Sequence, residues 1–120
     1  MRVRLIEGHP RIEATRNQVA VMRGPLVYCL ESPDLPEGVR LSDVAVRPAL
    51  WHARHRPELL GGVTVLEGEA DIRQPRAWNG TLYRELLPQA LDRRTVTLIP
   101  YYTCANRGVS EMTIWFALRR

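Results

Sequence analysis

Three carboxylates recur at every second position along the chain, at Glu67, Glu69 and Asp71. In an extended strand such residues share one face with neighbours about 7 Å apart, which is within the carboxyl separation of inverting glycosidases. A general acid, however, needs burial or a like-charged neighbour in a cleft to raise its pKa. A row of carboxylates on one strand is usually solvated, so we favour a solvated charged face over a catalytic one.

Two histidines, His52 and His55, stand in the segment Trp51-His-Ala-Arg-His-Arg56. A helical pair of metal ligands is normally spaced at i and i+4, no acidic or cysteine partner stands nearby, and the flanking arginines would repel a cation. We therefore expect surface histidines in a loop, with no metal and no cofactor.

The chain has two cysteines, Cys29 and Cys104, which are 75 positions apart. Two isolated thiols do not make a zinc site. Cys29 lies in an apolar run, which favours a buried free thiol, and a disulfide stays open as the alternative. Ser42 and Ser110 have no histidine in a triad-like context, so nucleophilic catalysis is unsupported.

The remaining candidates for a site are the aromatic residues, including Tyr101, Tyr102 and Trp115 near the C-terminus. Exposed rings on a β-domain can stack on sugars, whereas large aromatics also dominate cores and domain interfaces. We favour the core or interface role. A carbohydrate-binding module that uses exposed aromatics is the alternative.

The hydrophobic pattern that must position these residues has a period of two rather than 3.6. The chain also contains 8 glycines and 9 prolines, which interrupt regular elements. Together with the period of two, they predict short strands and no long helix. Ser32 to Gly38 reads as a loop, and Gln74 to Leu91 as an irregular stretch with a short strand around Leu82 and Tyr83. The expected strands include Val3 and Leu5, Ile12 to Thr15, Gln18 to Arg23, Leu26 to Glu31, Val44 to Arg47, Leu60 to Leu66, Arg94 to Ile99 and Met112 to Leu118.

Alternating faces predict an all-β fold with two antiparallel sheets packed as a jelly-roll-like β-sandwich. The 120 residues fit one domain, 1–120. The net charge is +4, but all 17 basic residues are arginines interleaved with acids, which argues against nucleic-acid binding. No apolar run suits a membrane span or a signal peptide, so a cytoplasmic location, or a piece of a larger protein, is expected.

Two segments carry a family resemblance. One runs from Val19 to Glu31 and contains Arg23-Gly-Pro-Leu-Val-Tyr-Cys-Leu-Glu31; the other runs from Pro100 to Trp115 and begins Pro-Tyr-Tyr-Thr-Cys-Ala-Asn-Arg-Gly108. Together they resemble the C-terminal region of the β-L-arabinofuranosidase-like enzymes, glycoside hydrolase family 127. The chain departs from the family at Cys104, where the family usually has tryptophan.

The resemblance implies a β-sandwich accessory domain that packs beside a catalytic (α/α) barrel. It also implies that the nucleophilic cysteine, the acid/base glutamate and the zinc-binding cysteines belong to that barrel, so neither Cys29 nor Cys104 inherits a catalytic role. We therefore expect no catalysis from this chain alone. A freestanding enzyme that uses the acidic strand is the least favoured hypothesis. In the isolated chain the surface that packs against the barrel would be exposed, and we expect it to promote self-association of the chain.

The expected contact residues, for carbohydrate or for a neighbouring domain, are Tyr101, Tyr102, Asn106, Arg107 and Trp115. Pro100 should end a strand because it cannot donate to the ladder. One of the two tyrosines should then enter the core while the other stays outside. Arg107 should be partly buried in a rigid turn, whereas Arg119 at the free end should contribute little.

Overall fold

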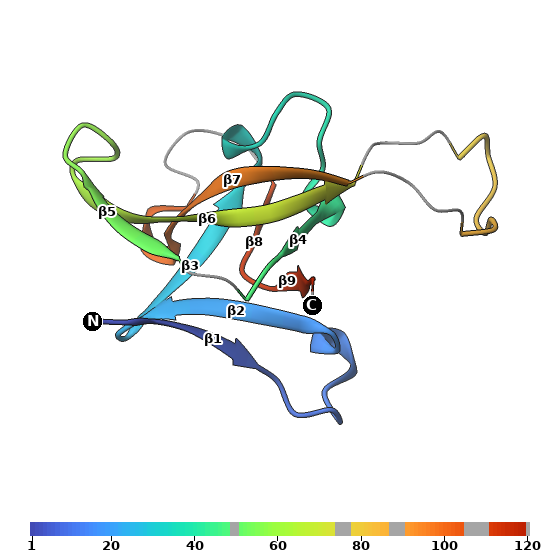
Figure 1. Ribbon diagram of the computed structural model, residues 1–120, viewed down its shortest axis with the longest axis horizontal. Helices are drawn as coiled ribbons and strands as arrows, with labels where there is room; N and C mark the ends of the chain where they lie inside the picture. Colours follow the sequence, from blue (N-terminus) through green and yellow to red (C-terminus); the bar gives the residue numbers. More distant parts are fainter. Residues whose placement is uncertain (49–50, 74–77, 87–90, 105–110, 120) are drawn as a thin grey trace.

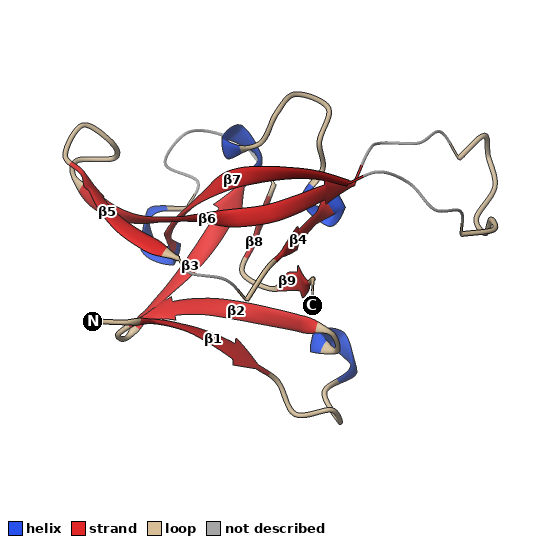
Figure 2. Ribbon diagram, in the orientation of Figure 1, coloured by secondary structure: helices blue, strands red, loops and turns tan. Residues whose placement is uncertain are grey.

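The computed structural model describes all residues except 49–50, 74–77, 87–90, 105–110 and 120. In the described part the fold is all-β, as the sequence predicts, and each helical element is a single 3-10 turn of three residues (Figures 1 and 2). The strands are β1 Val3–Glu7, β2 Gln18–Arg23, β3 Leu26–Glu31, β4 Val44–Val46, β5 His52–Arg56, β6 Val63–Arg73, β7 Leu91–Pro100, β8 Met112–Thr113 and β9 Phe116–Leu118. The 3-10 turns are η1 Glu13–Thr15, η2 Ser32–Asp34, η3 Leu41–Asp43 and η4 Tyr101–Thr103.

The strands form two layers whose hydrogen bonding is continuous. β1 and β2 lie in one layer, and β6 and β7 with β4 and β5 lie in the other (Figure 1). The pairing order β2-β9-β4-β6-β7-β3 returns to β2 through a short β2–β3 contact. The two layers of the sandwich therefore belong to one sheet whose strand order closes on itself. Closure of this kind leaves fewer strand edges exposed. Among the strands that the structure describes, the pairings are antiparallel except for the parallel pair β4–β9.

The core lies between these layers and follows the alternation of each strand. Leu66, Ala70 and Ile72 of β6 face it together with Val96 and Leu98 of β7. Gly68 interrupts this row because the ring of Trp51 occupies the space that its side chain would need. The other buried members are Val19, Val21, Tyr28, Leu30, Val44, Val46 and Phe116.

A smaller apolar cluster covers the opposite face of β6 and β7 near the β5–β6 turn. It contains Cys29, Val63, Val65 and Ile99. The remainder of that opposite face carries charged residues. The same strands thus position both the core and the charged face.

Three local expectations are wrong. Residues Ile12 to Thr15 do not form a strand: Glu13–Thr15 form η1 and Ile12 directly precedes it, because β1 pairs with β2 from Glu7↔Val19 and the chain between them must reverse. His52–Arg56 is a strand, β5, rather than a loop. Leu82 and Tyr83 are not in a strand and are 87% and 91% exposed.

Candidate functional site

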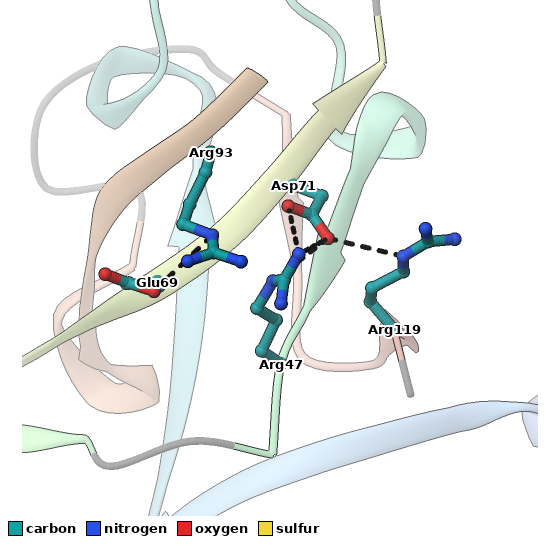
Figure 3. A network of polar contacts seen from close by, with 5 residues as sticks. All are labelled: Arg47, Glu69, Asp71, Arg93 and Arg119. Atoms are coloured by element: carbon teal, nitrogen blue, oxygen red, sulfur yellow. Dashed lines mark hydrogen bonds and ion pairs between the residues drawn. The ribbon is translucent and has the colours of Figure 1, made fainter. Parts of the chain in front are cut away.

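The acidic row of β6 does share one face of the sheet, as its spacing predicts. Glu67 lies 3.4 Å from Arg54 of β5, and Glu69 lies 3.7 Å from Arg93 of β7 (Glu69–Arg93 in Figure 3). These two ion pairs are partly or largely exposed, so each contributes little to stability. The face is a set of paired charges across neighbouring strands.

Asp71 differs from the other two carboxylates because it is only 3% exposed. Arg47 follows β4 and donates from Nε and from Nη2 to the two carboxylate oxygens, both at 3.1 Å. Arg119 follows β9 and places its Nε 3.5 Å from one of them (Figure 3). The expectation of a uniformly solvated row is therefore wrong at Asp71, and Arg119 is not a free terminal charge. The cluster links β6 to the ends of β4 and β9.

The two histidines of β5 do not form a metal site. They are three residues apart in a strand, so their side chains leave on opposite faces, and both are exposed. Across the described residues, no group of three or more His, Cys, Asp or Glu side chains could hold a metal ion.

The two cysteines form a disulfide, which corrects the expectation of a free thiol. Cys29 pairs with Ile99 in the β3–β7 ladder, and η4 follows directly after β7. Cys104 thereby returns to the neighbourhood of Cys29. The disulfide ties the end of η4 to the buried part of β3.

The structure describes three of the five predicted contact residues, Tyr101, Tyr102 and Trp115. β7 ends at Pro100 as expected, but Tyr101 and Tyr102 are both exposed, at 54% and 66%. The residue that turns inward is Thr103, whose hydroxyl donates to the Pro100 carbonyl at 2.7 Å. A 3-10 turn, unlike the expected extended chain, leaves both rings outside. Asn106 and Arg107 lie outside the described residues, and Trp115 lies half-buried between β8 and β9.

Tyr28 is a buried polar group that the sequence did not single out. Its hydroxyl donates to the Thr64 carbonyl at 2.8 Å, which joins β3 to β6 across 36 positions. Burial raises the pKa of this hydroxyl above its ordinary value, and the nearby positive charge of Arg23 opposes that shift only in part. The contact therefore ties β3 to β6, two strands that are separated by β7 in the strand order.

The described part of the β6–β7 connection, 78–86, is an arm that projects from the body of the domain (Figure 1). Its turn is closed by the Thr81 backbone N–H and hydroxyl, which donate to the Trp78 carbonyl at 2.9 and 2.6 Å. The Arg84 guanidinium stacks 3.7 Å from the centre of the Trp78 ring. Leu82, Tyr83 and Leu86 are each more than four-fifths exposed.

Together these features define an all-β domain with paired charges on one sheet face and an exposed apolar arm. No helix in the described ranges is long and apolar enough to cross a membrane. The chain belongs to glycoside hydrolase family 127: residues 3–117 match the model of the glycoside hydrolase family 127 C-terminal domain.

Individual relatives agree with this assignment. The chain is 36% identical over 119 residues to the non-reducing end β-L-arabinofuranosidase of Bifidobacterium longum subsp. longum, and the match covers 96% of the chain. It is 38% identical to the solved structure of a GH127 β-L-arabinofuranosidase from Geobacillus stearothermophilus T6, with a TM-score of 0.86 over 99% of the chain. A second solved structure, a glycoside hydrolase, is 40% identical with a TM-score of 0.89 over the whole chain.

The chain spans less than a quarter of these proteins. It covers 18% of the Bifidobacterium relative, 18% of the Geobacillus protein and 20% of the other glycoside hydrolase. The resemblance to the C-terminal region of the family is thus confirmed.

Proposed function

We propose that this chain is a non-catalytic C-terminal accessory domain that packs beside the catalytic barrel of an enzyme resembling the β-L-arabinofuranosidases. The observation that carries this proposal is the position and extent of the match: residues 3–117 correspond to the C-terminal domain of family 127, yet the chain spans only 18% of the Bifidobacterium relative. The paired, largely structural contacts of Glu67, Glu69 and Asp71 agree with a domain that performs no chemistry itself.

The surface that we assign to the partner domain is the arm. Trp78, Leu82, Tyr83 and Leu86 expose apolar area that the body of this domain does not bury, and buried aromatic and aliphatic anchors supply most of the energy of protein interfaces. Stacking of Arg84 on Trp78 fixes one part of the arm in advance, which lowers the entropy cost of docking. Exposed Tyr101 and Tyr102 on η4 form a second candidate contact.

The absence of activity is tested with the purified chain and an aryl β-L-arabinofuranoside, with the intact Bifidobacterium relative as the positive control. We expect turnover by the relative and none by the chain. Turnover by the chain that is lost in Glu69→Gln would contradict the proposal, because it would assign chemistry to the acidic strand.

Docking is tested in a chimera in which this chain replaces the matching region of the Bifidobacterium relative, a replacement that 36% identity makes reasonable. We expect the chimera to be soluble and active. Tyr83→Ser together with Leu86→Ser should reduce its thermal midpoint, whereas the matched exposed-residue change Ile12→Ser should not. Equal effects of both changes would remove the arm from the interface.

Self-association of the isolated chain through the same arm is a further expectation. Apolar residues that lack their partner domain tend to pair with one another. Sedimentation velocity should show a dimer of the chain that dissociates in the Tyr83→Ser, Leu86→Ser variant; a monomer at all concentrations would argue against it. The cytoplasmic location expected from the sequence stays a prediction.

A further inference from the structure

A groove of mixed polarity shares no lining residue with the arm or with the acidic row of β6. It runs between the segment of η3 and β4 and the segment of β8 and β9, and its volume is about 600 Å³. This volume is in the range of small-molecule sites. The side chains that line it and matter here are those of Gln18, Arg40, Ser42, Glu111, Thr113 and Trp115.

The aromatic side of the groove is held in place before any ligand arrives. Thr113 Oγ1 donates to the Trp115 carbonyl at 2.8 Å, and the Trp115 backbone N–H lies 3.3 Å from the same hydroxyl oxygen. The next residue, Phe116, is buried in the core at 2% exposure. Trp115 is itself half-buried, so a ligand that stacks on the ring would lose little to side-chain ordering.

The mouth of the groove carries one charge of each sign. Arg40 and Glu111 form an ion pair, and their side chains are 68% and 51% exposed. Their backbones are fixed: the Arg40 N–H donates to Asp43 Oδ2 at 3.1 Å, and the Glu111 N–H donates to Ser32 Oγ at 3.2 Å. The exposed ends of both side chains therefore stay within reach of a ligand.

We propose that this groove binds a neutral saccharide. The apolar face of a sugar ring would lie against Trp115, and its hydroxyl groups would accept from Arg40 and donate to Glu111. Because the charges of Arg40 and Glu111 are paired, their attraction and repulsion largely cancel for a simple anion or cation, whereas the hydroxyl groups of a neutral molecule can bond to both. Ser42, Thr113 and Gln18 add uncharged partners of the same kind.

The test is an NMR titration of the intact, isotope-labelled chain with neutral mono- and trisaccharides of pentoses and hexoses, at concentrations up to tens of millimolar. We expect at least one saccharide to shift the Trp115 indole signal and the amides of residues 40–44 and 111–117. Trp115→Ala should weaken binding about tenfold or more, while Trp78→Ala on the arm should leave it unchanged.

Arg40→Ala provides a second variant that should fold normally, because the side chain is mostly exposed; it too should weaken binding several-fold. Shifts confined to other surfaces, unchanged binding in both groove variants, or no shift with any saccharide would overturn the proposal. The chimera experiment remains independent of this outcome, because its readout is the arm.

Discussion

Arg47 donates two hydrogen bonds to the carboxylate of Asp71, from Nε and from Nη2, and each nitrogen lies 3.1 Å from a different oxygen. Asp71 is in β6 and Arg47 directly follows β4, so the pair fastens β6 to the end of β4, the strand that lies between β6 and β9 in the strand order. Residue Arg119, just after β9, adds a third charge at 3.5 Å. A buried carboxylate between two guanidinium groups is thus a joint between three strands.

Replacing Arg47 by alanine should destabilise the domain. The change leaves the buried carboxylate of Asp71 without its two-point partner, and loss of such a charged contact typically costs about 2 kcal/mol or more. Urea unfolding followed by circular dichroism measures the effect. Arg54→Ala, which removes a more exposed pair with Glu67, is the matched control and should change stability very little. Equal losses in the two variants would show that the Asp71 joint is no stronger than a surface pair.

Arg119→Ala should lower stability measurably but by less than Arg47→Ala. Arg119 reaches Asp71 through a single, longer contact and its side chain is 54% exposed. The same urea titration measures it, and the double variant should lose more than the sum of the two single losses, because each arginine still compensates the shared carboxylate when the other is removed. Strict additivity would mean that the two arginines act independently.

The disulfide between Cys29 and Cys104 closes a loop with a sequence separation of 75. A cross-link of this length should stabilise the folded chain by on the order of 4 kcal/mol through the entropy of the unfolded state. Cys104→Ser should therefore unfold at clearly lower urea concentration. Thiol titration of the unreduced, denatured chain should find no free thiol; two free thiols would mean that the pair is reduced in the isolated protein.

An alanine at Gly68 should be costly because its Cβ would overlap the Trp51 ring. Overpacking of this kind typically costs about 1–3 kcal/mol. Thermal unfolding of Gly68→Ala should show a lower midpoint. Trp51→Leu should partly rescue it in the double variant, since the smaller side chain vacates that space. If the double variant unfolds at the same temperature as Gly68→Ala or lower, the overlap with the Trp51 ring is not the cause of the loss.

Alkaline pH should destabilise the domain through Tyr28. Its pKa is raised by burial above the ordinary 10.0, so the folded state holds the phenol proton more tightly than the unfolded state does. The resulting stability is fully present below pH 10 and is lost as the pH rises above the unfolded pKa. Unfolding free energy measured from neutral to alkaline pH should fall more steeply for the native chain than for Tyr28→Phe. If the unfolding free energies of the two proteins fall with the same slope at alkaline pH, the loss of stability comes from groups other than Tyr28.

Several elements follow from the sequence because the signal is local. β2 and β3 occupy the predicted Gln18–Arg23 and Leu26–Glu31, since alternating apolar residues meet Gly24-Pro25, and Gly24 has a positive φ of 58°. β5 was missed for the opposite reason. Its residues His52–Arg56 are mostly exposed and polar, so the strand has no apolar alternation and depends on its pairing with β6.

The sequence alone determined the all-β class, the shared face of Glu67, Glu69 and Asp71, and the family resemblance carried by two motifs, because each rests on residue types and short spacings. Only the tertiary structure decided that Asp71 is buried, that Cys29 is bonded to Cys104, and that Trp115 lines the same groove as Arg40 and Glu111. These outcomes depend on contacts between residues 24 to 75 positions apart, which strand order and register create and which no local pattern encodes.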